Sequence, residues 1–480
     1  MEAVSVSFIV LLAFLFALQA SNDIWRKGNT GTDSSVFKYV ARVILSGGMP
    51  YKDTFDHKGP LIYLINAAGM KIAEWRGVWV FEFFAILLTF YFMYKITRLY
   101  VGRGMSIVLL VIASSPLFTY FEGGNLTEEY AMPFIAVSIY IFADYFLNAK
   151  VDPIRLAVCG FSFAAILLLR PNMCAVWLVM CIGVLGQCVW TKRQKELLPF
   201  IAYFVLGAFV LLIPVILWLM VNGALKACIE DYIIFNMQYS ADVQAGVANK
   251  IDSFIFFLNS SLILFSVCGL FYMCCSKRDY FDILQLIFIG TTLLLICVSG
   301  QKYKHYGMVL IPALSYPLAR IVGDLRENEP GKKLSSLLVV YLFVSFAASG
   351  WLGAVKNAAV EYSGRDELHF GVKEQEVVSM VLNNTSEDDR IIVLGNWDIV
   401  YNLSGRFAAS RYSYQSPPLK IDNERAEEFY RELQANKPKV IVLPDKAFGS
   451  EWVLQYVEEA GYYEIGKTTD QTVTIYGWGE

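Results

Sequence analysis

Stretches of apolar residues that are long enough to cross a bilayer recur about eleven times between residues 4 and 353. The chain is 56% hydrophobic and its mean hydropathy is +0.47, which is too apolar for a soluble protein. The 17% of charged residues are sufficient for loops and one water-exposed domain. These features predict a polytopic α-helical membrane protein.

The distribution of basic residues indicates the orientation of the spans. With residues 4–20 retained as a first span that starts in the cytoplasm, the later loops rich in Lys and Arg fall on the cytoplasmic side, as the positive-inside bias requires. The loop at residues 21–76 is the exception, because it is also rich in Lys and Arg. We keep this loop on the outer face, where a reaction would use its cations.

Charge and cysteine usage exclude two classes of function. The net charge of -3 is spread over the loops, and no basic tract is long enough to follow a phosphate backbone, so we expect no nucleic-acid partner. The cysteines all lie between Cys159 and Cys297, mostly inside apolar spans and without the spacing of a zinc site. The sequence supports neither a disulfide framework nor a zinc site.

The composition becomes that of a soluble protein from about residue 356. Helical patterns at 372–382, 424–434 and 452–460 alternate with strand patterns at 391–395, 440–444, 463–467 and 472–478. We therefore predict a transmembrane domain over residues 1–355 and a small extracytoplasmic α/β domain, with a partly parallel sheet, over residues 356–480.

The loop at residues 21–76 contains a short amphipathic pattern. Asp33 stands where an N-cap belongs, and the residues that follow form one apolar stripe: Val36, Phe37, Val40, Val43 and Ile44. The pattern predicts a helix that lies at the membrane interface and ends before Pro50. A second polar cluster, Asp56-His57-Lys58, precedes Pro60.

Four segments assigned to the outer face carry ionisable groups, and charges at membrane depth by default indicate function. These candidates are Asp33, Asp56, His57 and Lys58 in the first loop, Glu122, Glu128 and Glu129 in the second, Arg170 between two spans, and Lys302, Lys304, His305 and Tyr306 at a later membrane edge.

Each candidate also has a structural interpretation. Asp33 is either an N-cap or a general base. Glu128 either belongs to a capping box that begins at Asn125 or is a catalytic acid. Glu129 fits the catalytic role equally well. Arg170 either reaches the lipid headgroups or binds a phosphate. The clusters at 56–58 and 302–306 are either interfacial charge clusters or substrate-binding groups.

One reaction uses carboxylates and cations together at an outer membrane face: the transfer of a sugar from a lipid phosphate to a hydroxyl. A carboxylate removes the proton of the acceptor hydroxyl, and cations stabilise the phosphate that leaves. The donor arrives in the bilayer, so no nucleotide-sugar fold is needed.

The order of these features resembles the GT-C superfamily of polyprenyl-phosphate-sugar-dependent glycosyltransferases. The chain is most similar to bacterial family 39-like members, which are relatives of the protein O-mannosyltransferases and the lipid A aminoarabinose transferases. The resemblance covers roughly residues 1–355 and rests on the early acid Asp33, the loop Thr127-Glu128-Glu129, the pair Arg170-Pro171, and the Lys, His and Tyr residues before Pro312.

This resemblance implies an inverting transferase of the bacterial cytoplasmic membrane. It implies Asp33 as the base or the acceptor-binding group, Glu128 or Glu129 as an assisting acid, and basic residues that hold the donor phosphate, namely Arg170, Lys304 and His305. The implied partners are a lipid-linked sugar donor, membrane lipids, and an acceptor that is a glycan, a lipid or a protein.

The chain departs from the O-mannosyltransferases at one position of this pattern. It has Asp33-Ser34 where an Asp-Glu pair is usual, which argues against protein mannosylation and against a metal site of two carboxylates. A divalent cation stays open as a cofactor.

Two other functions fit the same class of protein. A transporter or flippase of lipid-linked glycans predicts charged residues in the middle of spans or helices broken in paired halves, whereas the charges here gather at span ends on one side. A glycan polymerase or ligase would share the basic cluster but act on diphosphate-linked donors.

Overall fold

The computed structural model describes residues 2–28, 31–148, 152–241, 246–260, 269, 279–327, 329–363 and 368–479. These residues form two compact units. The first, which we name the membrane unit, comprises Met1–Ile24, Trp79–Leu217 and Val243–Arg365, and the second, the sheet unit, comprises Trp25–Val78, Trp218–Asp242 and Asp366–Glu480. Composition places residues 25–78 and 218–242 in the predicted transmembrane domain, whereas their contacts place them in the sheet unit.

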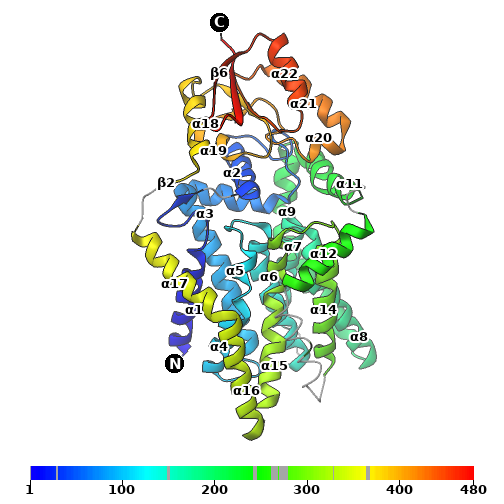
Figure 1. Cartoon of the computed structure of the whole chain (residues 1–480). Helices are drawn as coiled ribbons and strands as arrows, with labels where there is room; N and C mark the ends of the chain where they lie inside the picture. Colours follow the sequence, from blue (N-terminus) through cyan, green and yellow to red (C-terminus); the bar gives the residue numbers. More distant parts are fainter. Residues whose placement is uncertain are drawn as a thin grey trace. The chain divides into compact units, whose positions relative to one another are not determined.

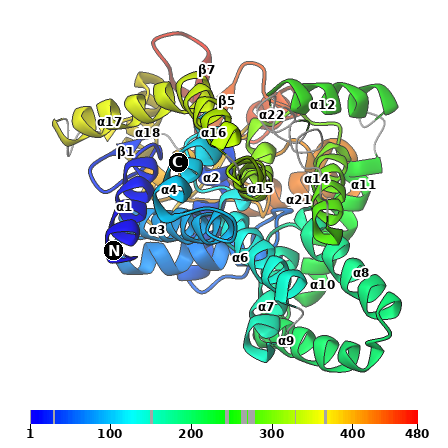
Figure 2. The ribbon, with the colours of Figure 1, turned by 90° about the horizontal axis from the view of Figure 1, so that it is seen from below.

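The membrane unit is helical. Its helices are α1 (Glu2–Ala17), the second half of α3 (Pro60–Thr97), α4 (Arg103–Ser114), α5 (Leu117–Tyr120), α6 (Thr127–Asn148), α7 (Pro153–Leu169), α8 (Ala175–Trp190), most of α9 (Leu197–Val221), α12 (Val247–Ser260), α14 (Tyr280–Cys297), α15 (Ser315–Leu325), α16 (Glu329–Leu342) and α17 (Ala348–Ser363). Short helical turns lie between them: η1 (Pro171–Met173), η2 (Gln194–Glu196), η5 (Lys304–Leu310), η6 (Pro312–Leu314) and η7 (Phe343–Ala347). Figure 1 shows α4, α6, α14 and α15 running in similar directions, and Figure 2 views α14 and α15 nearly along their axes.

Among the described residues, seven helical segments are long and apolar enough to cross a membrane, and three shorter apolar helices accompany them. This confirms the predicted class, a multi-pass helical membrane protein. The expected count of about eleven spans stays a prediction, and most of the span expected at 253–275 lies outside the described residues.

Two glycines let α7 and α9 approach closely. A Cβ atom built on Gly160 would lie 1.8 Å from the carbonyl oxygen of Phe204, and one built on Gly207 would lie 1.9 Å from that of Ala157. Neighbouring helices in membranes commonly pack through small residues, because van der Waals contact between backbones replaces the hydrophobic driving force. The α7–α9 crossing therefore requires glycine at both positions.

The sheet unit contains a five-stranded sheet in the order β4-β3-β5-β7-β6. Its strands are β3 (Arg390–Val393), β4 (Phe407–Ala408), β5 (Val440–Pro444), β6 (Tyr463–Lys467) and β7 (Val473–Gly477), and a separate parallel pair joins β1 (Lys27–Gly28) to β2 (Leu368–His369). β3 is parallel to β4 and β5, whereas β7 is antiparallel to β5 and β6. The predicted α/β domain with a partly parallel sheet is therefore confirmed.

The helices of the sheet unit come from three parts of the chain. They are α2 (Gly31–Leu45) and the first half of α3, then α10 (Leu225–Cys228), the π-helical turn η3 (Ile229–Ile234) and α11 (Phe235–Ala241), and finally α18 (Val372–Asn383), α19 (Ile399–Ser404), α20 (Pro418–Ile421), α21 (Asn423–Asn436) and α22 (Ser450–Glu459). The three longer C-terminal helices agree with the helical patterns read from the sequence.

Helix α2 packs against the C-terminal part of the sheet unit. The Tyr39 hydroxyl accepts a hydrogen bond from the backbone N–H of Ala408 at 2.9 Å, and Arg42 donates to the carbonyl oxygen of Tyr401 at 2.5 Å. The expected apolar stripe is buried, but the opposite face is buried as well. The helix begins at Gly31, whose φ is +71°, so Asp33 lies inside the first turn and the expected N-cap position is wrong.

We predict that Gly160→Ala and Gly207→Ala each destabilise the membrane unit by about 1–3 kcal/mol, because the added methyl group meets a backbone carbonyl that cannot move without shifting a helix. Thermal unfolding of the detergent-solubilised protein measures the effect. Gly104→Ala is the matched control, since a Cβ atom there has no neighbour within 4 Å. Equal stability of Gly160→Ala and the parent protein would contradict the close crossing.

Candidate functional site

The membrane unit brings three of the predicted residues together around Arg170. Pro171 ends α7, and Arg170 adopts an extended backbone at the break before α8. One guanidinium nitrogen donates to Glu128 Oε1 at 2.6 Å, and another donates to the Tyr306 hydroxyl at 2.6 Å. Glu128 also accepts from the Thr127 hydroxyl at 2.7 Å. Glu128 is buried and Arg170 is largely buried, since their side chains are 3% and 17% exposed.

A second contact joins the loop before α6 to η5. His305 Nδ1 lies 2.7 Å from Glu122 Oε2, and the backbone N–H of His305 donates to the same oxygen at 3.2 Å. These hydrogen bonds from His305 lower the pKa of Glu122, although partial burial opposes them. The His305 ring lies 4.9 Å from the Tyr306 ring, which connects this contact to Arg170.

The remaining two lysines of this edge lie outside that hydrogen-bond network. Lys302 pairs with Asp252 at 3.1 Å, and both side chains are about half-exposed. The side chain of Lys304 is exposed at the start of η5. The structure therefore brings Glu122, Glu128, Arg170, His305 and Tyr306 together and leaves Lys302 in a surface ion pair.

Glu129 has surroundings different from those of Glu128. Its Oε2 accepts a hydrogen bond from the backbone N–H of Asn125 at 2.7 Å. In the capping box considered above, Glu128 would accept this bond, so Glu129 takes the place expected for Glu128. The Glu129 carboxyl lies near that of Glu82, and both side chains are buried. Glu82 was absent from the predicted site, although an acid inside the apolar run 78–94 is a signal of function.

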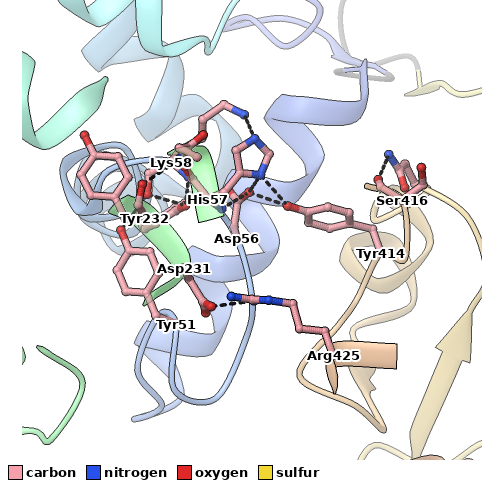
Figure 3. Close-up of polar contacts among 12 residues, drawn as sticks. Tyr51, Asp56, His57, Lys58, Asp231, Tyr232, Tyr414, Ser416 and Arg425 are labelled. Carbon is pink, nitrogen blue, oxygen red and sulfur yellow. Dashed lines mark hydrogen bonds and ion pairs between the residues drawn. The ribbon is translucent and has the colours of Figure 1, made fainter. Parts of the chain in front are cut away.

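The sheet unit gathers a second cluster around Asp56, which Figure 3 shows. Asp56 is 3% exposed. Its Oδ1 accepts from the Tyr414 hydroxyl and the backbone N–H of His57, each at 2.7 Å, and its Oδ2 accepts from the Tyr63 hydroxyl at 2.7 Å. Burial raises the pKa of Asp56, and Lys58 and the two tyrosines oppose this rise.

The hydrogen bonds of His57 fix its tautomer. Lys58 Nζ lies 3.0 Å from His57 Nε2, and an ammonium can only donate, so Nε2 must accept. The hydrogen of the neutral ring is therefore on Nδ1, which lies 3.2 Å from the Tyr414 hydroxyl. Lys58, His57, Tyr414 and Asp56 thus form one hydrogen-bonded chain.

Two further acids lie near this chain. Asp33 is partly exposed in the first turn of α2 and is close enough to Tyr414 to act on it electrostatically. Asp398, at the end of the loop after β3, is fully buried, which raises its pKa to about 7, while the nearby Ser413 hydroxyl lowers it and Asp56 raises it further. Tyr414 was absent from the predicted site because sequence spacing does not show which loops of a sheet domain meet.

Among the residues that the structure describes, no group of three or more His, Cys, Asp or Glu side chains is arranged to hold a metal ion. The divalent cation left open by the sequence stays untested.

We predict that Asp398→Asn stabilises the protein, and more so at about pH 8 than at about pH 5. The folded state keeps the Asp398 proton up to about pH 7, whereas the unfolded chain loses it near the ordinary value of 3.8. The folded state therefore binds more protons between these values, and its stability falls as pH rises. The gain at the higher pH should be roughly 2–4 kcal/mol.

Thermal unfolding at both pH values measures this effect, with the exposed Asp388→Asn as control. A shift that is the same at both pH values would show that Asp398 does not hold a proton in the folded state.

We also predict strong coupling between Arg170 and Glu128. Glu128→Gln or Arg170→Met alone leaves one buried charge unpaired and should cost about 3–5 kcal/mol, whereas the double variant should lose much less than the sum. Unfolding temperatures of the four proteins measure the coupling. Additive losses would mean that the two charges do not pair inside the protein.

Comparison with solved structures shows that this fold is shared. ArnT from Cupriavidus metallidurans, in a crystal structure bound to undecaprenyl phosphate, matches with a TM-score of 0.67 at 12% identity over 99% of this chain and 97% of its own. The oligosaccharyltransferase AglB from Archaeoglobus fulgidus, in complex with an inhibitory peptide and a dolichol-phosphate, matches with a TM-score of 0.52 at 10% identity over 99% of this chain and 74% of its own. These likenesses confirm the predicted GT-C fold.

Sequence comparison gives the family. A search of curated protein sequences finds no match. Residues 1–329 match the family described as "Putative competence-induced protein Ccs4 N-terminal domain". Because this match spans more than half of the chain, the protein belongs to the Ccs4 N-terminal domain family.

Proposed function

We propose that the protein is an inverting membrane glycosyltransferase that moves a sugar from a polyprenyl-phosphate donor to a hydroxyl of a cell-envelope acceptor. The observation that carries the proposal is the shared fold over 99% of the chain with ArnT, whose crystal structure contains undecaprenyl phosphate. AglB, with the same type of fold, is described in complex with a dolichol-phosphate. Both ligands are lipid phosphates, which agrees with a donor that arrives in the bilayer.

Each unit carries cations of the kind that stabilise a leaving phosphate. When the bond to the sugar breaks, negative charge develops on the phosphate, and fixed hydrogen-bond donors stabilise that charge. In the membrane unit, Arg170 is held in place by Glu128 and Tyr306, and Lys304 is exposed at the start of η5. In the sheet unit, the Lys58 ammonium is oriented by His57. These cations are our candidates for binding the donor phosphate.

The carboxylates differ in how well they suit proton removal. Asp56 accepts three protein hydrogen bonds, Glu128 is paired with Arg170, and the buried Glu129 accepts a hydrogen bond from the backbone N–H of Asn125. Asp33 is partly exposed at the start of α2, where an acceptor hydroxyl can reach it. We therefore assign the base role to Asp33 and a positioning role to Asp56.

The alternative of a transporter gains little support from the buried carboxyl pair. Ionisable residues inside spans mark many transport pathways, and Glu82 and Glu129 are buried in apolar helices. However, Glu129 lies in the first turn of α6 and also closes the preceding turn. Glu129 is therefore at a helix end and has a structural role, whereas Glu82 lies inside α3.

The cellular setting belongs to the same proposal. We place the protein in the bacterial cytoplasmic membrane, with the sheet unit on the outer side and a glycan, a lipid or a protein as the acceptor. The orientation rests on the distribution of Lys and Arg in the sequence.

We predict that Asp33→Asn lowers sugar transfer by roughly 10²–10⁴-fold and leaves donor binding unchanged, because the amide cannot accept the acceptor proton. The assay follows a labelled sugar from a polyprenyl-phosphate donor into the cell-envelope fraction. Thr32→Ala, at an exposed neighbouring position, is the control and should retain activity. Full turnover by Asp33→Asn would rule out the base assignment.

A further inference from the structure

The sheet unit contains a polar pocket of about 350 Å³ that is distinct from the Asp56 cluster. Residues of η3 line one side of it, and the segment that leads into α21, together with α21 itself, lines the other. The volume lies within the range typical of small-molecule sites. The lining is unusual for such a site, because it consists mainly of carboxylates and guanidinium groups.

The floor of the pocket is a fixed ion-pair network. Asp231 is 2% exposed and lies between two arginines, accepting from Arg425 at 2.7 Å and also from Arg411. Figure 3 shows Arg425 reaching Asp231 across this part of the unit. The Arg425 guanidinium also lies over the Phe55 and Phe235 rings at 5.0 and 5.1 Å. These contacts fix the polar groups before any ligand binds.

One face of α21 supplies the wall. Glu424, Glu428 and Arg431 are spaced so that they follow one another along the same side of the helix. Glu428 accepts from the Tyr412 hydroxyl at 2.5 Å, which orients its carboxylate. The side chains of Glu424 and Arg431 are exposed and line the pocket. The Glu424 carboxylate can accept a hydrogen bond from a ligand, and the Arg431 guanidinium can donate one.

We propose that this pocket binds an uncharged sugar unit of the acceptor, an inference that rests on the proposed glycosyl transfer. Each sugar hydroxyl both donates and accepts a hydrogen bond, and the lining contains carboxylate acceptors as well as guanidinium donors. The Asp231 charge is already balanced by Arg411 and Arg425. Inorganic phosphate would meet the excess of carboxylates in the lining, and a cation would compete with the internal arginines, so an uncharged polyhydroxyl ligand fits best.

Saturation-transfer NMR on the full-length, detergent-solubilised protein tests this inference. The probes are the methyl glycosides of glucose, galactose and N-acetylglucosamine, with inorganic phosphate as a competitor. We expect at least one glycoside to bind, and Glu424→Gln and Arg431→Ala each to weaken it about tenfold or more, since each removes a hydrogen bond to a charged group. Glu427→Gln, on the same helix but outside the lining, is the matched control.

The outcomes separate this inference from the proposed reaction. Asp33→Asn should bind the glycoside as tightly as the parent protein, because the measurement needs no turnover. The absence of glycoside binding, an equal affinity in Glu424→Gln and Arg431→Ala, or displacement of the glycoside by phosphate would each overturn the sugar site. If Asp33→Asn loses transfer and any of these results is also found, the proposed reaction is supported and only the sugar site in this pocket is overturned.

Discussion

An arginine that bridges a carboxylate and a phenol joins three separate parts of the membrane unit. Arg170 comes from the break between α7 and α8, Glu128 from the first turn of α6, and Tyr306 from η5. Removing two charges from water costs several kcal/mol for each ion, so a buried pair persists only where further hydrogen bonds satisfy both groups. The hydroxyls of Thr127 and Tyr306 supply them. A lipid phosphate bound at Arg170 would therefore share this guanidinium with Glu128.

The buried aspartates of the sheet unit differ in the hydrogen bonds and ion pairs that stabilise their carboxyl groups. Asp56 accepts hydrogen bonds from two tyrosines and a backbone N–H, and Asp231 lies between two guanidinium groups. Asp398 is buried beside a single serine hydroxyl, and its pKa rises to about 7. The number of donors around each carboxyl decides how much of the desolvation cost is offset. Asp33 is the acid of this group that retains contact with solvent, which agrees with the base role proposed for it.

The elements of the fold were largely predictable, because they depend on local periodicity. The strands at 440–444 and 463–467 and the helix at 372–382 follow directly from apolar patterns in the sequence. The short strand β4 and helix α19 carry too few residues to give a pattern. Within the site, Glu128 and Arg170 were predictable as charges at span ends, but their pairing was not, because 42 positions of sequence separate them.

The bounds of the two units differ from those that composition predicts, and the difference has a physical reason. Residues 25–78 and 218–242 include the polar loops between spans together with parts of α3 and α9, yet they fold with the C-terminal sheet. Helix α2 buries its polar face as well as its apolar stripe, and Tyr39 and Arg42 find their hydrogen-bond partners on residues 401–408. Buried polar groups without partners are costly, so α2 depends on the C-terminal residues for its stability. Because α2 carries Asp33, the C-terminal sheet is a structural part of the proposed site and not a separable appendage.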